Sequence, residues 1–318
     1  MKDKSISKGS RGTKLFVVVM GVALAIGIGA AVVLATLAVP KTQNSEDNPR
    51  TVFWRHIHGL GIDPADRDVL YIATHGDFYK SVNAGPPIKV DELRADYMAF
   101  NSPMNAGTPL YASGHPVTGG NTGLIKSTNG GKTWDRVATI LEPPVDFHAM
   151  ATSQSDPNTI VGYDSSGRGF FKTTDAGKTW AELPIPDYIT ALAIEPTDSN
   201  TIFAGFAGSQ KGVARSVDGG ISWTVLDQYK GLTIFALVFD ENGVLYASTT
   251  ENGFSRSSDH GKTWENISAP DLTVMTMAVD AQNNILYIAG YVPDGYQEVY
   301  KSSDDGNTWD LIGTNKEL

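Results

Sequence analysis

Residues 173–180 read TTDAGKTW, and four further segments repeat the same pattern of Ser/Thr, any residue, Asp/Asn, any residue, Gly, any residue, Thr/Ser and Trp. These segments are STNGGKTW at 127–134, SVDGGISW at 216–223, SSDHGKTW at 257–264 and SSDDGNTW at 302–309. A shortened copy, SVNAG at 81–85, lacks the Thr-Trp ending. In such a segment the Asp or Asn side chain accepts hydrogen bonds from backbone N–H groups just after it, so we expect each copy to form a tight turn.

The six copies recur at a regular interval. Their third residues lie 46, 46, 43, 41 and 45 positions apart, at Asn83, Asn129, Asp175, Asp218, Asp259 and Asp304. A period of about 40–45 residues with strand-like content is typical of β-propeller blades. Each repeat reads as four short strands, and the Trp of the turn opens the fourth strand and fills space between blades. The sequence therefore predicts an all-β fold, a single six-bladed β-propeller over residues 51–318.

The motifs resemble those of the BNR, or Asp-box, repeat proteins, and the resemblance covers roughly residues 52–315. That superfamily includes sialidases, xyloglucanases, sortilin ectodomains and photosystem assembly factors. The chain looks most like small bacterial members with one propeller and an N-terminal anchor, which are often labelled glycosyl hydrolases. Because the Asp box is a turn, the resemblance implies the fold and leaves the function open.

A basic segment and a long apolar segment precede the repeats. Residues 1–14 carry five basic residues against one Asp, and the 25 residues from 15 to 39 include no charged residue. A helix of this length spans a bilayer, and the basic residues before it favour an N-inside orientation. We therefore expect a cytoplasmic tail over 1–14, a transmembrane anchor over 15–39, a linker over 40–50, and an extracellular propeller held at the cell membrane. Alternatively, residues 15–39 are a cleaved signal peptide and the propeller is secreted.

The composition limits the partners of the propeller. The chain has no cysteine, which excludes disulfides and thiolate metal sites. Its net charge is −10, and because residues 1–14 contribute +4, the remainder carries −14. An acidic domain disfavours nucleic acid as a partner, whereas it tolerates cations and neutral sugars.

Five of the six histidines fall into one region when the repeats are aligned. The residues that open the innermost strand include His58, Met98 and His148. Those two positions earlier include His56, Asp96 and Asp146, and those that end the second strand include His75 and His115. The end of the second strand lies beside the start of the first in an antiparallel pair. The three rows are therefore expected to converge at one mouth of the central channel.

Imidazoles, carboxylates and thioethers are ligands of transition metals. We therefore predict that the mouth binds a ligand, most simply a transition metal ion such as Cu or Zn. The candidate ligands are His56, His58, His75, His115, His148, Asp96 and Met98, of which three or four would suffice. The thioether of Met98 favours copper.

Two other functions stay open. A glycosyl hydrolase acting on extracellular glycan would use Asp96 and Asp146, on adjacent repeats, as its acid pair, and a separation of about 6.5–9.5 Å would suit inversion. Three convergent arginines are not visible in the sequence, which disfavours the sialidase activity found among the resembling proteins. The resemblance also implies that xyloglucanases place their acids between two propellers, whereas this chain has one. Without a metal or a glycan, the propeller would be a scaffold that binds a protein or a cell-wall polymer.

Overall fold

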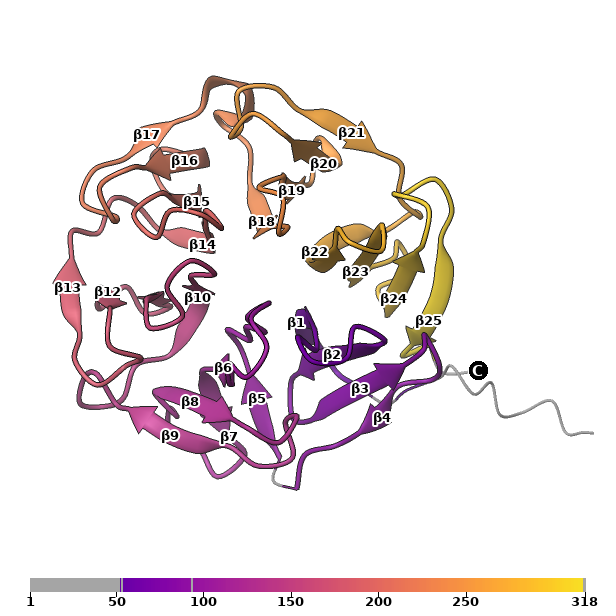
Figure 1. Cartoon of the computed structure of the whole chain (residues 1–318), viewed down its shortest axis with the longest axis horizontal. Coiled ribbons are helices and arrows are strands. Elements are labelled where there is room, and N and C mark those ends of the chain that lie inside the picture. The colour runs from indigo at the N-terminus through magenta and orange to yellow at the C-terminus, as the bar shows by residue number, and fades with distance from the viewer. Residues whose placement is uncertain (1–51, 53, 93, 317–318) are drawn as a thin grey trace, which may run out of the picture. The chain divides into compact units, whose positions relative to one another are not determined.

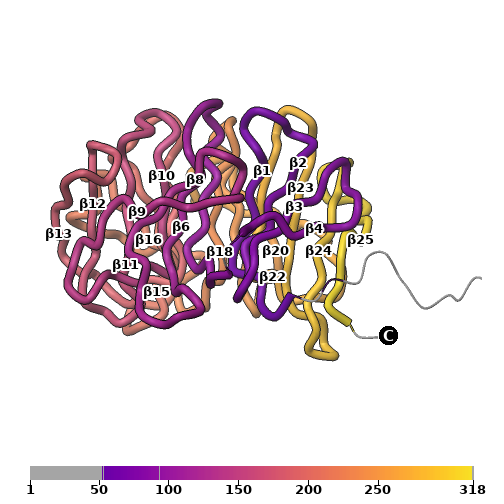
Figure 2. Tube along the Cα trace, turned by 90° about the horizontal axis from the view of Figure 1, so that it is seen from below, coloured from indigo at the N-terminus to yellow at the C-terminus, as the bar shows by residue number. Residues whose placement is uncertain are grey.

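The computed structural model describes residues 52, 54–92 and 94–316, which form a ring of six blades around a central channel (Figure 1). The predicted all-β propeller and its blade number are confirmed. In the side view most strands run between the two faces of the ring (Figure 2). The anchor predicted over residues 15–39 lies outside the described residues. Within the described ranges, no helix is long and apolar enough to cross a membrane.

Five blades are four-stranded antiparallel sheets whose strands follow one another along the chain from the channel to the rim. From the channel to the rim, blade 1 consists of β1 (Ile57–Ile62), β2 (Val69–Thr74), β3 (Phe78–Val82) and β4 (Ile88–Lys89), and blade 3 consists of β10 (Phe147–Thr152), β11 (Ile160–Asp164), β12 (Phe170–Thr173) and β13 (Ala181–Leu183). Blade 4 consists of β14 (Ile189–Ile194), β15 (Ile202–Phe206), β16 (Gly212–Ser216) and β17 (Thr224–Val225), and blade 5 consists of β18 (Ile234–Phe239), β19 (Leu245–Thr249), β20 (Gly253–Ser257) and β21 (Glu265–Ile267). Blade 6 consists of β22 (Thr273–Asp280), β23 (Ile285–Tyr291), β24 (Gln297–Ser302) and β25 (Asp310–Thr314). A short 3-10 helix, η1 (Asp227–Tyr229), follows β17.

Blade 2 departs from the regular pattern. Strand β5 (Ala95–Tyr97) pairs with β7 (Gly114–Pro116), while β6 (Leu110–Ala112) pairs with β8 (Leu124–Ser127), which pairs with β9 (Asp135–Ala138). The break falls at Gly114, whose φ is 137° and where a Cβ would lie 2.1 Å from the backbone oxygen of Asp96. Because of this break, Met98 follows β5 instead of opening an inner strand as the sequence alignment implied.

The Asp boxes form the predicted turns. In the box of blade 3, the Asp175 carboxylate accepts hydrogen bonds from the backbone N–H of Thr179 at 2.9 Å and from its hydroxyl at 2.6 Å. These bonds lower the pKa of Asp175 to about 2. Trp180 stands directly before the outer strand β13 and donates from its indole to the Gly177 carbonyl at 3.0 Å. The same position is held in the other complete boxes by Trp134, Trp223, Trp264 and Trp309.

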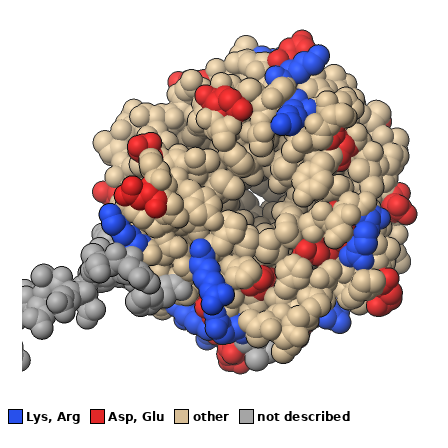
Figure 3. Space-filling model, turned by 180° about the vertical axis from the view of Figure 1, so that it is seen from behind, with Lys and Arg blue, Asp and Glu red and all other residues tan. Residues whose placement is uncertain are grey.

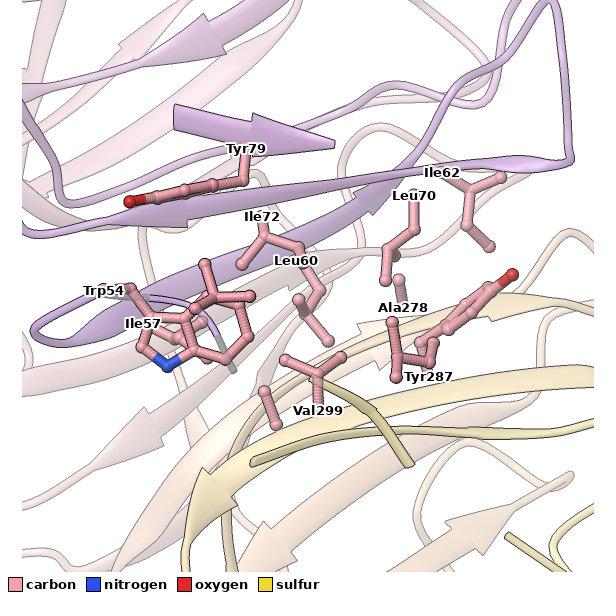
Figure 4. Packing of buried hydrophobic residues seen from close by; sticks show 13 residues of the cluster. Trp54, Ile57, Leu60, Ile62, Leu70, Ile72, Tyr79, Ala278, Tyr287 and Val299 are labelled. Carbon is pink, nitrogen blue, oxygen red and sulfur yellow. The ribbon is translucent and has the colours of Figure 1, made fainter. Parts of the chain in front are cut away.

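The ring closes between blade 6 and blade 1 by packing and hydrogen bonds, because none of the sheets formed by the described residues combines strands of blades 1 and 6. Trp54, Ile57 and Leu60 of blade 1 share a buried cluster with Tyr287 and Val299 of blade 6 (Figure 4). This seam brings the two ends of the described chain together.

Candidate functional site

The inner strands enclose a channel cavity of about 190 Å³. His58, Met98 and His148 line this cavity, as the aligned repeats implied. The channel opens at the centre of the face shown in Figure 3, where Lys, Arg, Asp and Glu are scattered without a large patch of one sign.

Two of the predicted ligands, His115 and His148, come together between blades 2 and 3 with Asp146, which the sequence suggested only as a glycosidase acid. His115 lies in β7, Asp146 directly precedes β10, and His148 is the second residue of β10. Their ligand atoms all lie within 4.8 Å of one another. The Nε2 atoms of His115 and His148 lie 3.1 Å and 2.9 Å from Oδ2 of Asp146. The Asp146 side chain is 8% exposed, while the imidazoles are 36% and 40% exposed, so the group is anchored on its acidic side and open on its histidine side.

The hydrogen bonds prepare this group for a cation. Nδ1 of His115 lies 3.2 Å from the carbonyl oxygen of Gly120, which can only accept, so Nδ1 carries the proton. In the neutral ring the lone pair is then on Nε2, the atom that faces Asp146. Oδ2 of Asp146 lies 2.9 Å from Nε2 of His148 and 3.1 Å from Nε2 of His115 and accepts the Ser165 hydroxyl at 2.9 Å, whereas its buried Oδ1 has no hydrogen-bond partner in the described part of the chain.

Electrostatics keep Asp146 ionised. Burial alone would raise the pKa of this carboxyl, but the hydrogen bond from His148 and the charges of His148 and His115 outweigh it and hold the pKa below the usual value. A carboxylate with a lowered pKa can bind a cation or act as a base, but it is a poor proton donor at neutral pH.

A second ion pair fixes the backbone that carries Asp146. The buried carboxylate of Asp164 accepts from the Asp146 backbone N–H at 2.9 Å and from Arg168 at 2.6 Å. Arg168 also donates to the carbonyls of Pro143 and Pro144, both at 2.9 Å. Aligning the repeats placed Ser165 at the end of its strand but gave Asp164 no role, because no sequence motif marks a residue that holds the backbone of another site residue in place.

The remaining predicted ligands form a second group on blades 1 and 2. Nδ1 of His75 lies 3.0 Å from Oδ2 of Asp96, and these residues form an isolated bridge between blades 1 and 2. The rings of His56 and His58 lie 4.4 Å apart, and those of His58 and His75 lie 6.2 Å apart. Tyr291 packs against His56 with ring centroids 5.6 Å apart.

His58 occupies the centre of the mouth. Burial, followed by the neighbouring charges of His56, His148 and His75, lowers its pKa to about 3, although Asp146 acts in the opposite direction. Its ring is therefore neutral at physiological pH, as a metal ligand must be. The buried Nε2 of His58 has no hydrogen-bond partner among the described residues. The structure thus divides the predicted set into a group around Asp146 and a group around Asp96, with His58 and Met98 lining the cavity.

Known proteins share the propeller but differ in size. Residues 122–252 match the family model Sortilin-Vps10, described by sortilin and neurotensin receptor 3. A xyloglucanase of a Paenibacillus species is 24% identical over an alignment covering 95% of this chain and 35% of that protein. Xyloglucanase Xgh74A of Acetivibrio thermocellus is 26% identical, covering 59% of this chain and 28% of that protein. The GH74 xyloglucanase structure from Xanthomonas campestris superposes with a TM-score of 0.58 and 18% identity, covering 81% of this chain and 45% of that one.

Fold and turns together define an Asp-box β-propeller. The chain is a β-propeller that is similar to Sortilin-Vps10 proteins over residues 122–252 and to xyloglucanases at 24% and 26% identity. It spans 28% and 35% of the length of the two curated relatives named above.

Proposed function

We propose that the mouth of the propeller binds a divalent transition-metal ion through His115, Asp146 and His148. The observation that carries the proposal is the convergence of their three ligand atoms within 4.8 Å. Two imidazoles and one carboxylate are a ligand set that suits Zn²⁺ and related ions, and three protein ligands leave a further coordination position for water or a small molecule. The unpartnered Oδ1 of Asp146 supports this reading, because a buried carboxylate oxygen without a partner is costly.

The support around the ligands fits the same function. Metal-binding histidines commonly donate their second ring N–H to a carbonyl or carboxylate, which fixes the tautomer. His115 has such a bond to Gly120. Asp164 and Arg168 hold the backbone of Asp146 in place. The N-terminal membrane anchor and the extracellular position of the propeller remain predictions from the sequence.

The test is elemental analysis and Zn²⁺ titration of the purified full-length chain and three variants. We expect near-stoichiometric binding in the wild type and its loss in His115→Asn and His148→Asn. His260→Asn is the matched control, because His260 lies in an Asp box and has a φ of 58°, which Asn adopts readily. Absence of Zn²⁺, Cu²⁺ and Ni²⁺ binding in the wild type would refute the proposal, as would full binding in both mouth variants.

A glycan is the second candidate ligand, and the comparisons support it more directly than they support a metal. Both relatives named above are xyloglucanases. The mouth also presents an aromatic side chain, Tyr188, which is 46% exposed and packs edge-on against Tyr163 with centroids 5.6 Å apart. This exposed ring offers an apolar face to a sugar.

Hydrolysis of a glycan at this mouth would use the two carboxylates Asp96 and Asp146. Asp96 and Asp146 each pair with histidine, and the lowered pKa of Asp146 suits a base or nucleophile. The test is to measure binding and cleavage of xyloglucan oligosaccharides. If the glycan reading is correct, Tyr188→Ala weakens binding while Asp146→Asn abolishes any cleavage. Unchanged glycan affinity in Tyr188→Ala, with no cleavage by the wild type, would contradict this reading and leave the metal proposal intact.

A further inference from the structure

Every methionine in the described part of the chain lines the channel cavity. These residues are Met98, Met104, Met150, Met275 and Met277. Methionine commonly fills irregular gaps in cores, and Met150 and Met277, which are 6% and 2% exposed, fit that role. Met98 and Met275 differ from them because both are only partly buried and both stand at the mouth end of their segments.

Met275 and His58 stand at the same register irregularity of the innermost strands of blades 6 and 1, and Met98 is in blade 2, the next blade of the ring. Met275 is in β22 of blade 6, His58 is in β1 of blade 1, and Met98 follows β5 of blade 2. All three line the same cavity. The segments that carry them belong to consecutive blades, in which β22, β1 and β5 follow one another around the ring (Figure 1).

Direct contacts hold these blades in register. The backbone N–H of Leu60 donates to the hydroxyl of Thr276 at 3.3 Å, which ties the strand of His58 to the residue after Met275. On the other side, blade 2 packs against the glycines of β1. A Cβ at Gly59 would lie 3.0 Å from the Cβ of Phe100, so the two segments are in close contact just below the mouth.

The backbone of blade 2 also anchors Met98 next to blade 3. The N–H of Met98 donates to the carbonyl of Ser113 at 2.9 Å, and the hydroxyl of the same serine accepts from Phe147 N–H at 3.1 Å. The segment of Met98 is therefore fixed between the His58 strand and the His148 strand. Such positioning from both sides favours a fixed arrangement of the donors.

A soft metal ion matches this donor set. Thioethers and imidazoles together suit Cu(I), whereas hard ions such as Mg²⁺ and Ca²⁺ prefer oxygen ligands. The buried Nε2 of His58 has no hydrogen-bond partner among the described residues, which leaves a nitrogen available as a ligand. We propose that Met275, His58 and Met98 form a Cu(I) site in the channel, separate from the His115–Asp146–His148 group. The site extends the proposed metal function but shares none of its three ligands.

The experiment is an anaerobic Cu(I) titration of the purified full-length chain against a competing chelator. We expect the Met98→Leu/Met275→Leu double variant to lose Cu(I) affinity by about tenfold or more, the scale on which altered ligand surroundings weaken metal sites. Leu conserves the volume of Met, so the fold should persist, and circular dichroism checks this. The matched control is Met150→Leu/Met277→Leu, which makes the same change at buried positions and should keep the affinity.

X-ray absorption of the Cu(I)-loaded wild type provides a measurement that does not depend on variants. Copper–sulfur scattering is expected in the wild type and in the control. Absence of sulfur scattering in the wild type, or an equal loss of affinity in both double variants, would overturn the site. His115→Asn should abolish Zn²⁺ binding and keep Cu(I) binding. Failure of Zn²⁺ binding alone would therefore refute only the proposed function, and failure of Cu(I) binding alone would refute only this site.

Discussion

At the scale of single residues, His58 has the most perturbed environment in the mouth. Its pKa is lowered to about 3, first by burial and then by three neighbouring histidines. A free histidine takes up a proton near pH 6.5. The folded protein should therefore keep His58 neutral between pH 7 and about 4, while the unfolded chain protonates there. The contribution of His58 to the free energy of unfolding is complete above pH 6.5 and is lost as the pH falls towards 3.

NMR of the histidine side chains measures this directly. We expect the His58 ring signals to stay constant from pH 7 to about 4.5, and assignment follows from the signals lost in His58→Asn. In the same variant, stability should depend less on pH between 6.5 and 4 than in the wild type or in His260→Asn. A His58 titration midpoint near 6.5 would contradict the buried environment.

The sequence identified the residue types at the mouth but not their grouping. Aligning the repeats placed His115, Asp146 and His148 at the same mouth as the other histidines, because antiparallel pairing fixes which strand ends are neighbours, but it did not single out these three. It did not reveal that Asp96 pairs with His75 on the other side. Side-chain direction depends on the local backbone of each blade, and the break at Gly114 in blade 2 is visible only in three dimensions.

At the scale of elements, the Asp box was predictable because its hydrogen bonds are local. The groups that donate hydrogen bonds to Asp175 lie within four positions of it, so the motif alone is enough to predict the turn. The first residue of the box has a second role that the pattern did not disclose. In the same turn the hydroxyl of Thr173 accepts the Gly177 N–H at 3.0 Å and donates to Asp175 at 2.8 Å.

The shortened box of blade 1 shows what the complete motif contributes. Here the Ser81 hydroxyl donates to the carbonyl of Gly85 instead of accepting its N–H. Asn83 and Ala84 both adopt positive φ, 51° and 54°. The outer strand that follows, β4, has only two residues. The outer strand β17 is equally short although it follows a complete box, and blade 1 persists without the Thr-Trp ending because its inner strands are buried on both faces.

At the scale of the whole molecule, the stability of the ring depends on contacts between residues that are distant in sequence. Arg67 of blade 1 contacts Glu241 of blade 5 and lies 2.7 Å from the buried carboxylate of Asp280 in blade 6. At the seam, the backbone N–H of Val52 donates to the Thr314 carbonyl at 2.8 Å. The repeat period predicted the number of blades, but it contained no information on how the last blade joins the first.

Gln297 is the residue on which we expect this closure to depend most. It is fully buried, its side-chain oxygen accepts the Ile57 N–H at 2.8 Å, and its backbone N–H donates to the Asn315 side chain at 2.6 Å. Asn315 in turn donates to the carbonyl of Trp54 at 3.2 Å. Removal of the Gln297 amide leaves the buried N–H of Ile57 without a partner, which costs about 1–3 kcal/mol.

We therefore expect Gln297→Ala to lower the free energy of unfolding by about that amount, measured by urea titration followed by tryptophan fluorescence. Gln228→Ala is the matched control, because Gln228 is exposed in η1 and its side chain faces no seam. The loss should also appear as faster proteolysis near the N-terminal end of blade 1, since the Ile57 strand is held to blade 6 by this bond. Equal stability of the two variants would show that apolar packing around Trp54 and Tyr287 closes the ring without the Gln297 hydrogen bond.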